Sequence, residues 1–481
     1  MAGVFLVMKA IGKPHGGGLK RRGVTGVSPV GKGCVSNEVR TRGKAFPLKM
    51  LIFSLSLVLF SCVTMADYDF NRIDSNLAAG NYGAVSEELA QKQSTIYGSH
   101  DEVLISLDAG LVAHYDGRTE ESNKALTRAE RLMDAYYSKS VSQTVASIMT
   151  NDMAMDYEGE DFEDIYTNLF MALNYIEEDL FDDAMVEIRR FDHKLKNLRA
   201  HYEEFIEELE KTQDASKLTR VNIQFYNSAL AHWLGMLLNR VEGDYDNVRI
   251  DGTLLEEAFT TQRSLYDFSV PSTVAAEKKA RRMDSRLNVL AFSGCAPVKK
   301  EDVVRAISWR GSVWYKLALP RMEKRHSAIT GISMTATNRE TGMQYSRALE
   351  QIESLENICV DTFQQSYSEL FAKAMLRSIA KTAANTAVNT IGRKAPSPGM
   401  SALFTFLDFA TKISNEATER ADVRTCRFFP AKASVTGMEL PEGDYSVVVE
   451  FKAGGHVAYS VKKDISVRAG KLNLVEASCL R

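Results

Sequence analysis

Cys62 is the residue whose setting in this sequence points most directly to a chemical reaction. It closes the segment Leu59-Phe60-Ser61-Cys62, with leucine three positions before the cysteine and a small residue directly before it. This order resembles a lipobox, the signal at which a peptidase cuts before a cysteine whose thiol carries lipid. Phe60 departs from the smaller residue that is common at its position. We expect cleavage after Ser61 and lipid attachment at Cys62.

The segment before this cysteine has the layout of a signal peptide. Lys49 precedes a twelve-residue apolar run, 50–61, which is too short to cross roughly 30 Å of hydrocarbon as a helix. A plain secretory signal cut near Ala66 and an uncleaved anchor remain open as alternatives. Residues 1–47 show no apolar periodicity, so translation from Leu48 is a further hypothesis.

Three aromatic residues form a second group that could bind a ligand. Trp309, Trp314 and Tyr315 lie in a β-prone region, where aromatic rings could stack on a sugar ring. The same residue types are equally suited to a hydrophobic core. They are the candidate ligand-stacking residues of this chain.

No pattern of known catalytic chemistry occurs in the sequence. Gly-x-Ser-x-Gly, His-Glu-x-x-His, Gly-x-Gly-x-x-Gly and Walker A motifs are missing. His114, His193, His201 and His232 fall in expected helices, where a lone histidine usually packs or faces solvent. We predict no catalytic residues, no cofactor and no metal, and we expect the protein not to be an enzyme.

The acidic run 156–164 invites two interpretations. Its carboxylates could bind calcium, but they do not follow the EF-hand pattern. They directly precede an expected helix, whose N-terminus favours acidic residues through its dipole. We favour the structural interpretation. Further along, Glu187, Arg189 and Arg190 could form a buried ion-pair network, but we expect a solvated face.

Four cysteines follow Cys62: Cys295, Cys359, Cys426 and Cys479. In an oxidising cell envelope they allow three disulfide pairings, and the sequence does not choose among them. None belongs to a Cys-x-x-Cys motif, and no spacing with histidine suits zinc.

Charge is distributed unevenly along the chain. Residues 1–61 contain ten Lys or Arg and one acid, Glu38, so the remainder has 59 − 10 = 49 basic and 62 − 1 = 61 acidic residues. A body with a net charge of about −12 does not attract phosphate backbones. We therefore expect no nucleic-acid partner.

Residues 67–268 show four similar turns between amphipathic helical segments. The turns, at 79–82, 115–118, 178–181 and 242–245, contain glycine or acidic residues. Each separates two stretches with apolar residues at helical spacing, which predicts helical hairpins.

These hairpins resemble tetratricopeptide repeats. Small and large residues around the third turn match the packing positions of that repeat: Met171, Ala172, Tyr175, Phe181, Ala184 and Ile188. The turns lie 37, 62 and 64 residues apart, so the expected array is not a tight series of 34-residue units. In repeat proteins of this kind, stacked helix pairs offer a concave surface.

Most of residues 67–451 is similar to a family of uncharacterised bacterial lipoproteins with tetratricopeptide-like repeats. The matching segments are 156–163, 172–175, 184–190, 288–297, 317–320, 374–381 and 421–427. Cys426 stands where this family has tryptophan. The resemblance implies an architecture and a location in the cell envelope, and it implies no activity.

The predicted fold is mostly α, with tetratricopeptide-like helical-hairpin repeats, then an α+β region and a small C-terminal β-sandwich-like module. Strands are expected near 287–292, 312–319, 329–337 and in the last fifty residues, with helices at 347–357 and 361–391. The expected domains are a leader and signal peptide at 1–61, a repeat domain at 62–270, a mixed region at 271–430 and the β module at 431–481.

The predicted function follows from anchor and repeats. We expect a lipid-anchored cell-envelope lipoprotein that serves as a protein-binding adaptor or scaffold. It would be held to the membrane through acyl chains on Cys62, in the outer membrane facing the periplasm. The alternative is an envelope binder of a polysaccharide or small ligand. A wall-active enzyme is the least favoured class.

Overall fold

The structure is a computed structural model that describes residues 68–140, 155–210, 224–307, 314–366 and 421–481. Its contacts divide the chain into two units, Met1–Cys62 and Val63–Arg481, and all described residues belong to the second. The architecture below is that of the second unit.

The first half of this unit consists of helices joined by tight turns. The helices are α3 (Asn71–Ala78), α4 (Tyr82–Gln91), α5 (Gln93–Ile96), α6 (Glu102–Tyr115), α7 (Thr119–Ser140), α9 (Asp161–Glu177), α10 (Phe181–Glu210), α11 (Ala229–Glu242), α12 (Tyr245–Thr261) and α13 (Val274–Glu277). Among these described helices, none combines the length and apolar composition needed to cross a bilayer.

The four predicted turns are confirmed. They join α3 to α4, α6 to α7, α9 to α10 and α11 to α12, and the helices of each pair pack on one another. Each turn contains one residue with positive φ: Gly80, Gly117, Asp179 and Gly243. Glycine adopts this conformation without a Cβ clash, and aspartate tolerates it better than most residues.

The second half of the unit is mainly strand. The strands are β1 (Arg286–Cys295), β2 (Val298–Ile307), β3 (Trp314–Glu323), β4 (Gly331–Asn338), β5 (Gln344–Ser354), β6 (Pro430–Glu439), β7 (Gly443–Ala453), β8 (His456–Val467) and β9 (Asn473–Cys479). Seven of them form one sheet in the order β8-β7-β4-β5-β6-β1-β9, while β2 and β3 form a separate two-stranded sheet. Within the large sheet, only the pair β1–β9 is parallel.

The large sheet curls into a nearly closed barrel, and its edge strands β8 and β9 pack against each other. Alternate residues point inward, as the period of two requires. Met334, Val447, Val449 and Phe451 are among the fully buried side chains of this inner core. The interior is therefore filled by apolar side chains from β1, β4, β7 and their neighbours.

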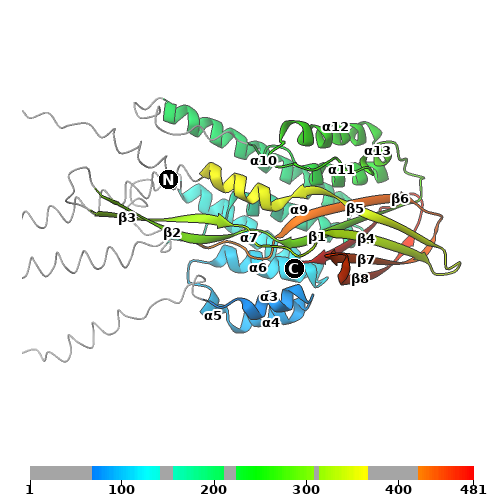
Figure 1. Ribbon diagram of the computed structural model, residues 1–481. Coiled ribbons are helices and arrows are strands. Elements are labelled where there is room, and N and C mark those ends of the chain that lie inside the picture. Colours follow the sequence, from blue (N-terminus) through cyan, green and yellow to red (C-terminus); the bar gives the residue numbers. More distant parts are fainter. Residues whose placement is uncertain (1–67, 141–154, 211–223, 308–313, 367–420) are drawn as a thin grey trace, which may run out of the picture. The chain divides into compact units, whose positions relative to one another are not determined.

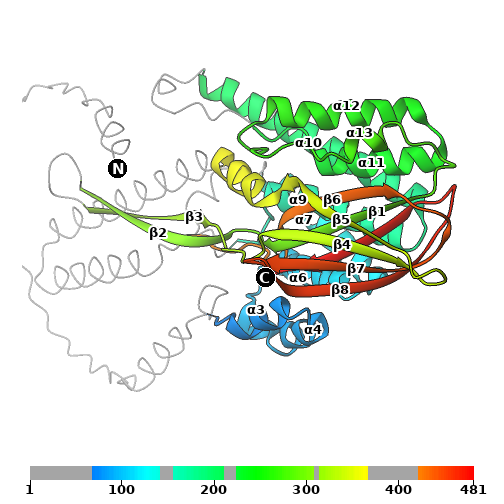
Figure 2. The ribbon, with the colours of Figure 1, turned by 45° about the vertical axis from the view of Figure 1, so that its right-hand side comes forward.

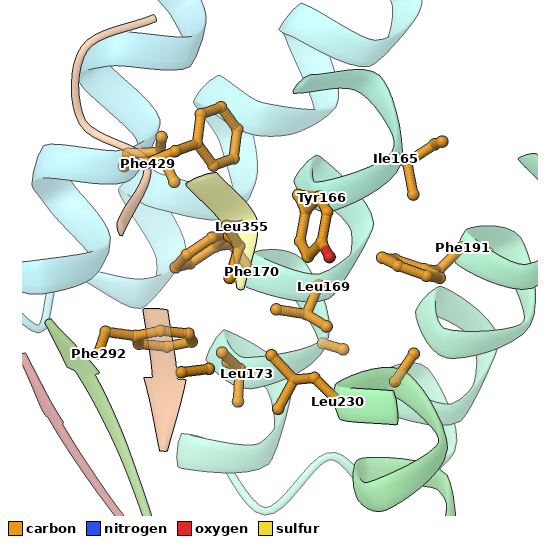
Figure 3. Packing of buried hydrophobic residues seen from close by; sticks show 14 of the residues in the cluster. Ile165, Tyr166, Leu169, Phe170, Leu173, Phe191, Leu230, Phe292, Leu355 and Phe429 are labelled. Atoms are coloured by element: carbon orange, nitrogen blue, oxygen red, sulfur yellow. The ribbon is translucent and has the colours of Figure 1, made fainter. Parts of the chain in front are cut away.

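A second, larger core lies between the helices and the outer face of the sheet. Phe170 of α9 stands at its centre, with its ring 5.4 Å from that of Phe292 on β1 and 5.8 Å from that of Phe429. Figure 3 shows these rings together with Leu169, Leu173 and Leu230 from the helices. Complete burial of one such phenylalanine stabilises the fold by about 1.5–3 kcal/mol.

The predicted fold class is wrong. The protein is not a mostly α repeat protein with a small C-terminal β-sandwich, because one seven-stranded, nearly closed sheet takes strands from residues 286 to 479. The helices α6, α9 and α11 pack against this sheet instead of lining an open groove (Figures 1 and 2). An apolar stripe at helical spacing predicts a buried face, but it does not tell whether a helix or a sheet covers that face.

Two local predictions are also wrong. Residues 347–357 were expected to be helical, yet β5 extends to Ser354 and a helix follows only over residues 355–366. Glutamate, glutamine and alanine in β5 favour a helix locally, but its position between β4 and β6 decides the outcome. Strand β2 was missed because charged residues fill its first half. The rest of the expected helix 361–391 lies outside the described residues.

Candidate functional site

The β2–β3 hairpin contains the described members of the aromatic group. Trp314 pairs with Ile307 and Tyr315 pairs with Ala306, at the far end of the hairpin from the large sheet. Trp309, Cys62 and Ser61 lie outside the described residues.

Charged side chains hold the base of the hairpin in place. Lys299 of β2 is buried and forms an ion pair with Glu160, directly before α9. Just beyond β3, Arg325 donates hydrogen bonds to the carbonyl oxygens of Ala296, at 2.7 Å, and Arg427. The hairpin thus starts from a polar base that connects it to the helices and to the chain that enters β6.

Glu163 is the centre of this base. Its side chain is fully buried and accepts four hydrogen bonds: from the Tyr157 hydroxyl at 2.7 Å, the Glu160 amide at 3.0 Å, the Cys426 amide at 2.6 Å and the Thr425 hydroxyl at 3.1 Å. Burial raises the pKa of Glu163, and these hydrogen bonds oppose that rise. We call Glu163 and its four donors the Glu163 junction.

Arg424 stabilises the same region through ion pairs and a hydrogen bond. Its guanidinium is almost fully buried, lies 2.7 Å from Asp422 and 2.9 Å from Asp101, and donates to the Met155 carbonyl. Burial lowers the pKa of Arg424, but the two carboxylates outweigh it and raise that pKa. The arginine therefore stays charged and links the start of α6 to residues 155 and 422.

The structural interpretation of the acidic run is confirmed. Asp161, Glu163 and Asp164 occupy the first turn of α9, and Glu160 with Glu163 forms a capping box. No group of three or more histidine, cysteine or acidic side chains among the described residues is arranged to hold a metal ion. The carboxylates of this run stabilise the helix end and the hairpin base.

A second buried carboxylate, Glu353 of β5, was not identified from the sequence. It accepts hydrogen bonds from Tyr166, from Ser228 at 2.7 Å, from the Leu230 amide at 2.9 Å and from Tyr266 at 2.9 Å. These donors come from α9, the start of α11 and the loop after α12. Glu353 therefore fastens the helices to the sheet, and burial raises its pKa.

A third buried acid forms an ion-pair network at the start of β1. Glu277 is fully buried between Arg240 and Arg286, and it also accepts a hydrogen bond from Asn288 at 2.9 Å. Because the charges are paired and hydrogen-bonded, this network is a structural link between α11, α13 and β1.

The histidines that the structure describes have structural partners where they are buried. His114 places Nδ1 2.7 Å from Asn174 and Nε2 2.9 Å from Glu476 on β9. His232 lies 2.9 Å from Asp251. Burial lowers the pKa of His114, yet Glu476 and Asn174 outweigh that effect and raise it.

The expected solvated face around Glu187 is wrong for that residue. Glu187 is buried and accepts a hydrogen bond from Asn168 at 2.6 Å, while Asn168 also donates to Glu130 at 2.9 Å. Arg190 approaches both acids at 3.3–3.4 Å and stays half exposed. Arg189 and Arg190 are both exposed, as predicted.

The four cysteines of the described chain are free thiols, so none of the three disulfide pairings is formed. Cys359 and Cys426 are buried in the core between helices and sheet, and Cys479 in the barrel core. Burial raises the pKa of Cys479 to about 11, which disfavours the reactive thiolate.

Comparison with protein-family models, with curated proteins and with solved structures finds no match for the chain. The site is therefore characterised by its own geometry. A polar base fixes one end of a ten-pair hairpin, and Trp314 and Tyr315 pair at its other end.

Proposed function

We propose that the protein is a lipid-anchored cell-envelope lipoprotein that serves as an adaptor for another envelope protein or peptide. Acyl chains on Cys62 hold it in the outer membrane, facing the periplasm. The anchor rests on the signal-peptide pattern and the lipobox-like segment that ends at Cys62.

The adaptor role is supported by exposed apolar side chains on the helices. Among the described residues, eight large hydrophobic side chains are exposed, and four of them lie on α10, α12 and their preceding turns. These are Leu180 at 43%, Val186 at 44%, Tyr245 at 37% and Ile250 at 47% exposure. Exposed apolar residues on the second helices of two consecutive pairs support a protein contact there.

The partner surface differs from the one that the helical pattern suggested. The faces of α6, α9 and α11 that would line a groove pack against the protein's own sheet. The second helices of the last two pairs, α10 and α12, remain as the surface for a partner (Figure 2).

The test combines intact mass with partner capture. A mass that fits a chain beginning at acylated Cys62 supports the anchor. In-cell crosslinking is then compared between the natural chain, Ile250→Asp and Thr253→Asp, since both positions are exposed on α12. We expect Ile250→Asp to lose the crosslinked envelope protein and Thr253→Asp to keep it.

Two results would count against this function. A chain without lipid removes the anchor. If the double variant Ile250→Asp/Val186→Asp still crosslinks to the same protein, the surface of α10 and α12 is excluded as the contact.

A further inference from the structure

One end of the seven-stranded sheet brings together three segments that lie far apart in the sequence. They are the start of α12 at Tyr245, the loop 278–284 that leads into β1, and the turn 468–471 between β8 and β9. Because β1 runs from this end toward the β2–β3 hairpin, the three segments lie at the end of the sheet away from that hairpin (Figures 1 and 2).

Direct contacts fix the three segments to one another. The Arg282 amide donates a hydrogen bond to the Tyr245 hydroxyl at 3.2 Å, and the Arg282 carbonyl accepts one from the Gly470 amide at 2.9 Å. The guanidinium carbon of Arg281 lies 4.5 Å from the centre of the Tyr245 ring, which is a cation–π contact. These contacts hold the loop between α12 and the β8–β9 turn.

This end of the sheet is basic, although the protein as a whole is acidic. Segments 278–284 and 468–471 contain six Lys or Arg residues and one acid, Asp284. The chain after residue 61, in contrast, has 49 basic and 61 acidic residues. Asp284 is already engaged, because it accepts a hydrogen bond from the Arg281 amide at 2.7 Å.

Four of the six basic side chains are available to a partner. Ion pairs engage the other two, Lys278 with Glu256 and Arg468 with Asp444. The remaining four are exposed and have no carboxylate at ion-pair distance within the described ranges: Lys279, Arg281, Arg282 and Lys471. We call these four side chains, together with Met283 next to them, the basic patch.

The basic patch includes an exposed apolar side chain. Met283 is 72% exposed, and its sulfur lies beside Gly470. Methionine adapts its shape to a protein partner, and arginine binds a carboxylate through two hydrogen bonds. Tyr245 connects the patch to the exposed side chain of Ile250 on α12. An acidic protein segment with an apolar side chain fits this surface better than a membrane, which requires only positive charge.

We propose that the basic patch binds an acidic segment of the envelope protein that contacts α12. This inference rests on the proposed adaptor function and specifies the chemistry of its partner. The unpaired positive charges attract the acidic segment and orient it, while Met283 and Tyr245 contact its apolar side chain.

A photoreactive residue in the patch tests this chemistry. Met283 is replaced by p-benzoylphenylalanine in the acylated full-length chain, the cells are irradiated, and the crosslinked segment is identified by mass spectrometry. We expect a segment of an envelope protein with more acidic than basic residues. Arg281→Glu/Arg282→Glu should reduce the crosslink at least about fivefold. Lys124→Glu/Arg131→Glu, at exposed positions of α7, should keep it.

The captured segment is then made as a synthetic peptide, and its affinity for the protein is measured by fluorescence anisotropy. We expect Arg281→Gln/Arg282→Gln to weaken binding about fivefold, as for the loss of two exposed charge pairs. Binding to the natural chain should weaken more with added sodium chloride than binding to this variant. Lys124→Gln/Arg131→Gln removes two charges elsewhere and should leave the affinity unchanged.

The outcomes separate the patch from the adaptor function. If Ile250→Asp loses the partner but the photoreactive residue at position 283 captures nothing, the adaptor function stands and the acidic-segment inference is overturned. If no envelope protein is captured from either surface, both are overturned. A crosslink to phospholipid, to a neutral or basic segment, or to a second copy of this chain contradicts the inference. An equal loss in the α7 control assigns the effect to total charge and also contradicts it.

Discussion

The seven-stranded sheet and the β2–β3 hairpin contain strands of similar length but are held in different ways. The outer face of the sheet, which includes Phe292, is covered by helices, and the inner face, which includes Phe451, is filled by apolar side chains. The hairpin is fixed at its base by polar contacts around Glu163 and Arg325. Stability is therefore concentrated in the sheet and its helices, while the hairpin depends on the Glu163 junction for its position.

The largest expected effect lies in the core between helices and sheet. Phe170→Ala removes a fully buried ring that contacts Phe292, Phe429 and His114. We expect the free energy of unfolding to fall by about 3–5 kcal/mol in chemical denaturation. Leu180→Ala, at a 43% exposed position, should change it by about 0.5 kcal/mol or less. Equal losses in the two variants would show that this core does not hold the helices to the sheet.

Glu353→Gln tests the polar link between the same two layers. Each carboxylate oxygen of Glu353 accepts two hydrogen bonds, so the amide group of glutamine faces two donors whichever way it turns. We expect a loss of about 2–4 kcal/mol in the free energy of unfolding. Glu350→Gln on the same strand is the control, because its contact with Ser272 is exposed. A loss under about 1 kcal/mol at Glu353 would contradict a structural role.

Glu163→Gln applies the same change at the hairpin base. Its two oxygens also accept two hydrogen bonds each. We expect a loss of about 1–3 kcal/mol, together with faster tryptic cleavage at Arg305 and Lys316. Cleavage at Arg339, between β4 and β5, should stay unchanged and serves as the internal control. Unchanged cleavage of the hairpin would show that the Glu163 junction does not hold the hairpin in position.

The smallest effect is a pH dependence at His114. Its folded-state pKa is raised, chiefly by Glu476 against the opposing effect of burial, so the folded protein binds the proton more tightly than the unfolded chain. This contribution to stability is complete below the ordinary histidine pKa of about 6.5 and is lost as pH rises through the folded value. We expect the midpoint of chemical denaturation to decrease when the pH is raised from 6 to 8. The decrease should be smaller in Glu476→Gln. An equal change of the midpoint with pH in both chains would show that the His114–Glu476 pair does not cause the pH dependence.

Local features of the fold could be predicted from the sequence. Glycine and aspartate at the turns indicated where the four helix pairs bend, and the acidic residues before Ile165 indicated the start of α9. These features depend on residues close together in the chain, where propensity and capping act directly.

The barrel and the junctions could not be predicted in this way. Glu163 meets the Cys426 amide across 263 positions, and Glu353 meets Tyr166 across 187. Nothing near these glutamates in the sequence distinguishes them from solvated acids. Strand β5 has a helix-favouring composition, so only its two neighbouring strands explain its conformation.

The helices and the seven-stranded sheet are held together as one folded unit by the core around Phe170 and by the buried acceptor Glu353. Hydrogen–deuterium exchange of the natural chain and of Glu353→Gln measures this coupling. We expect exchange in Glu353→Gln to be faster in α11 and β5 together and unchanged in β7 and β8. Faster exchange in β5 alone, with no change in α11, would contradict it.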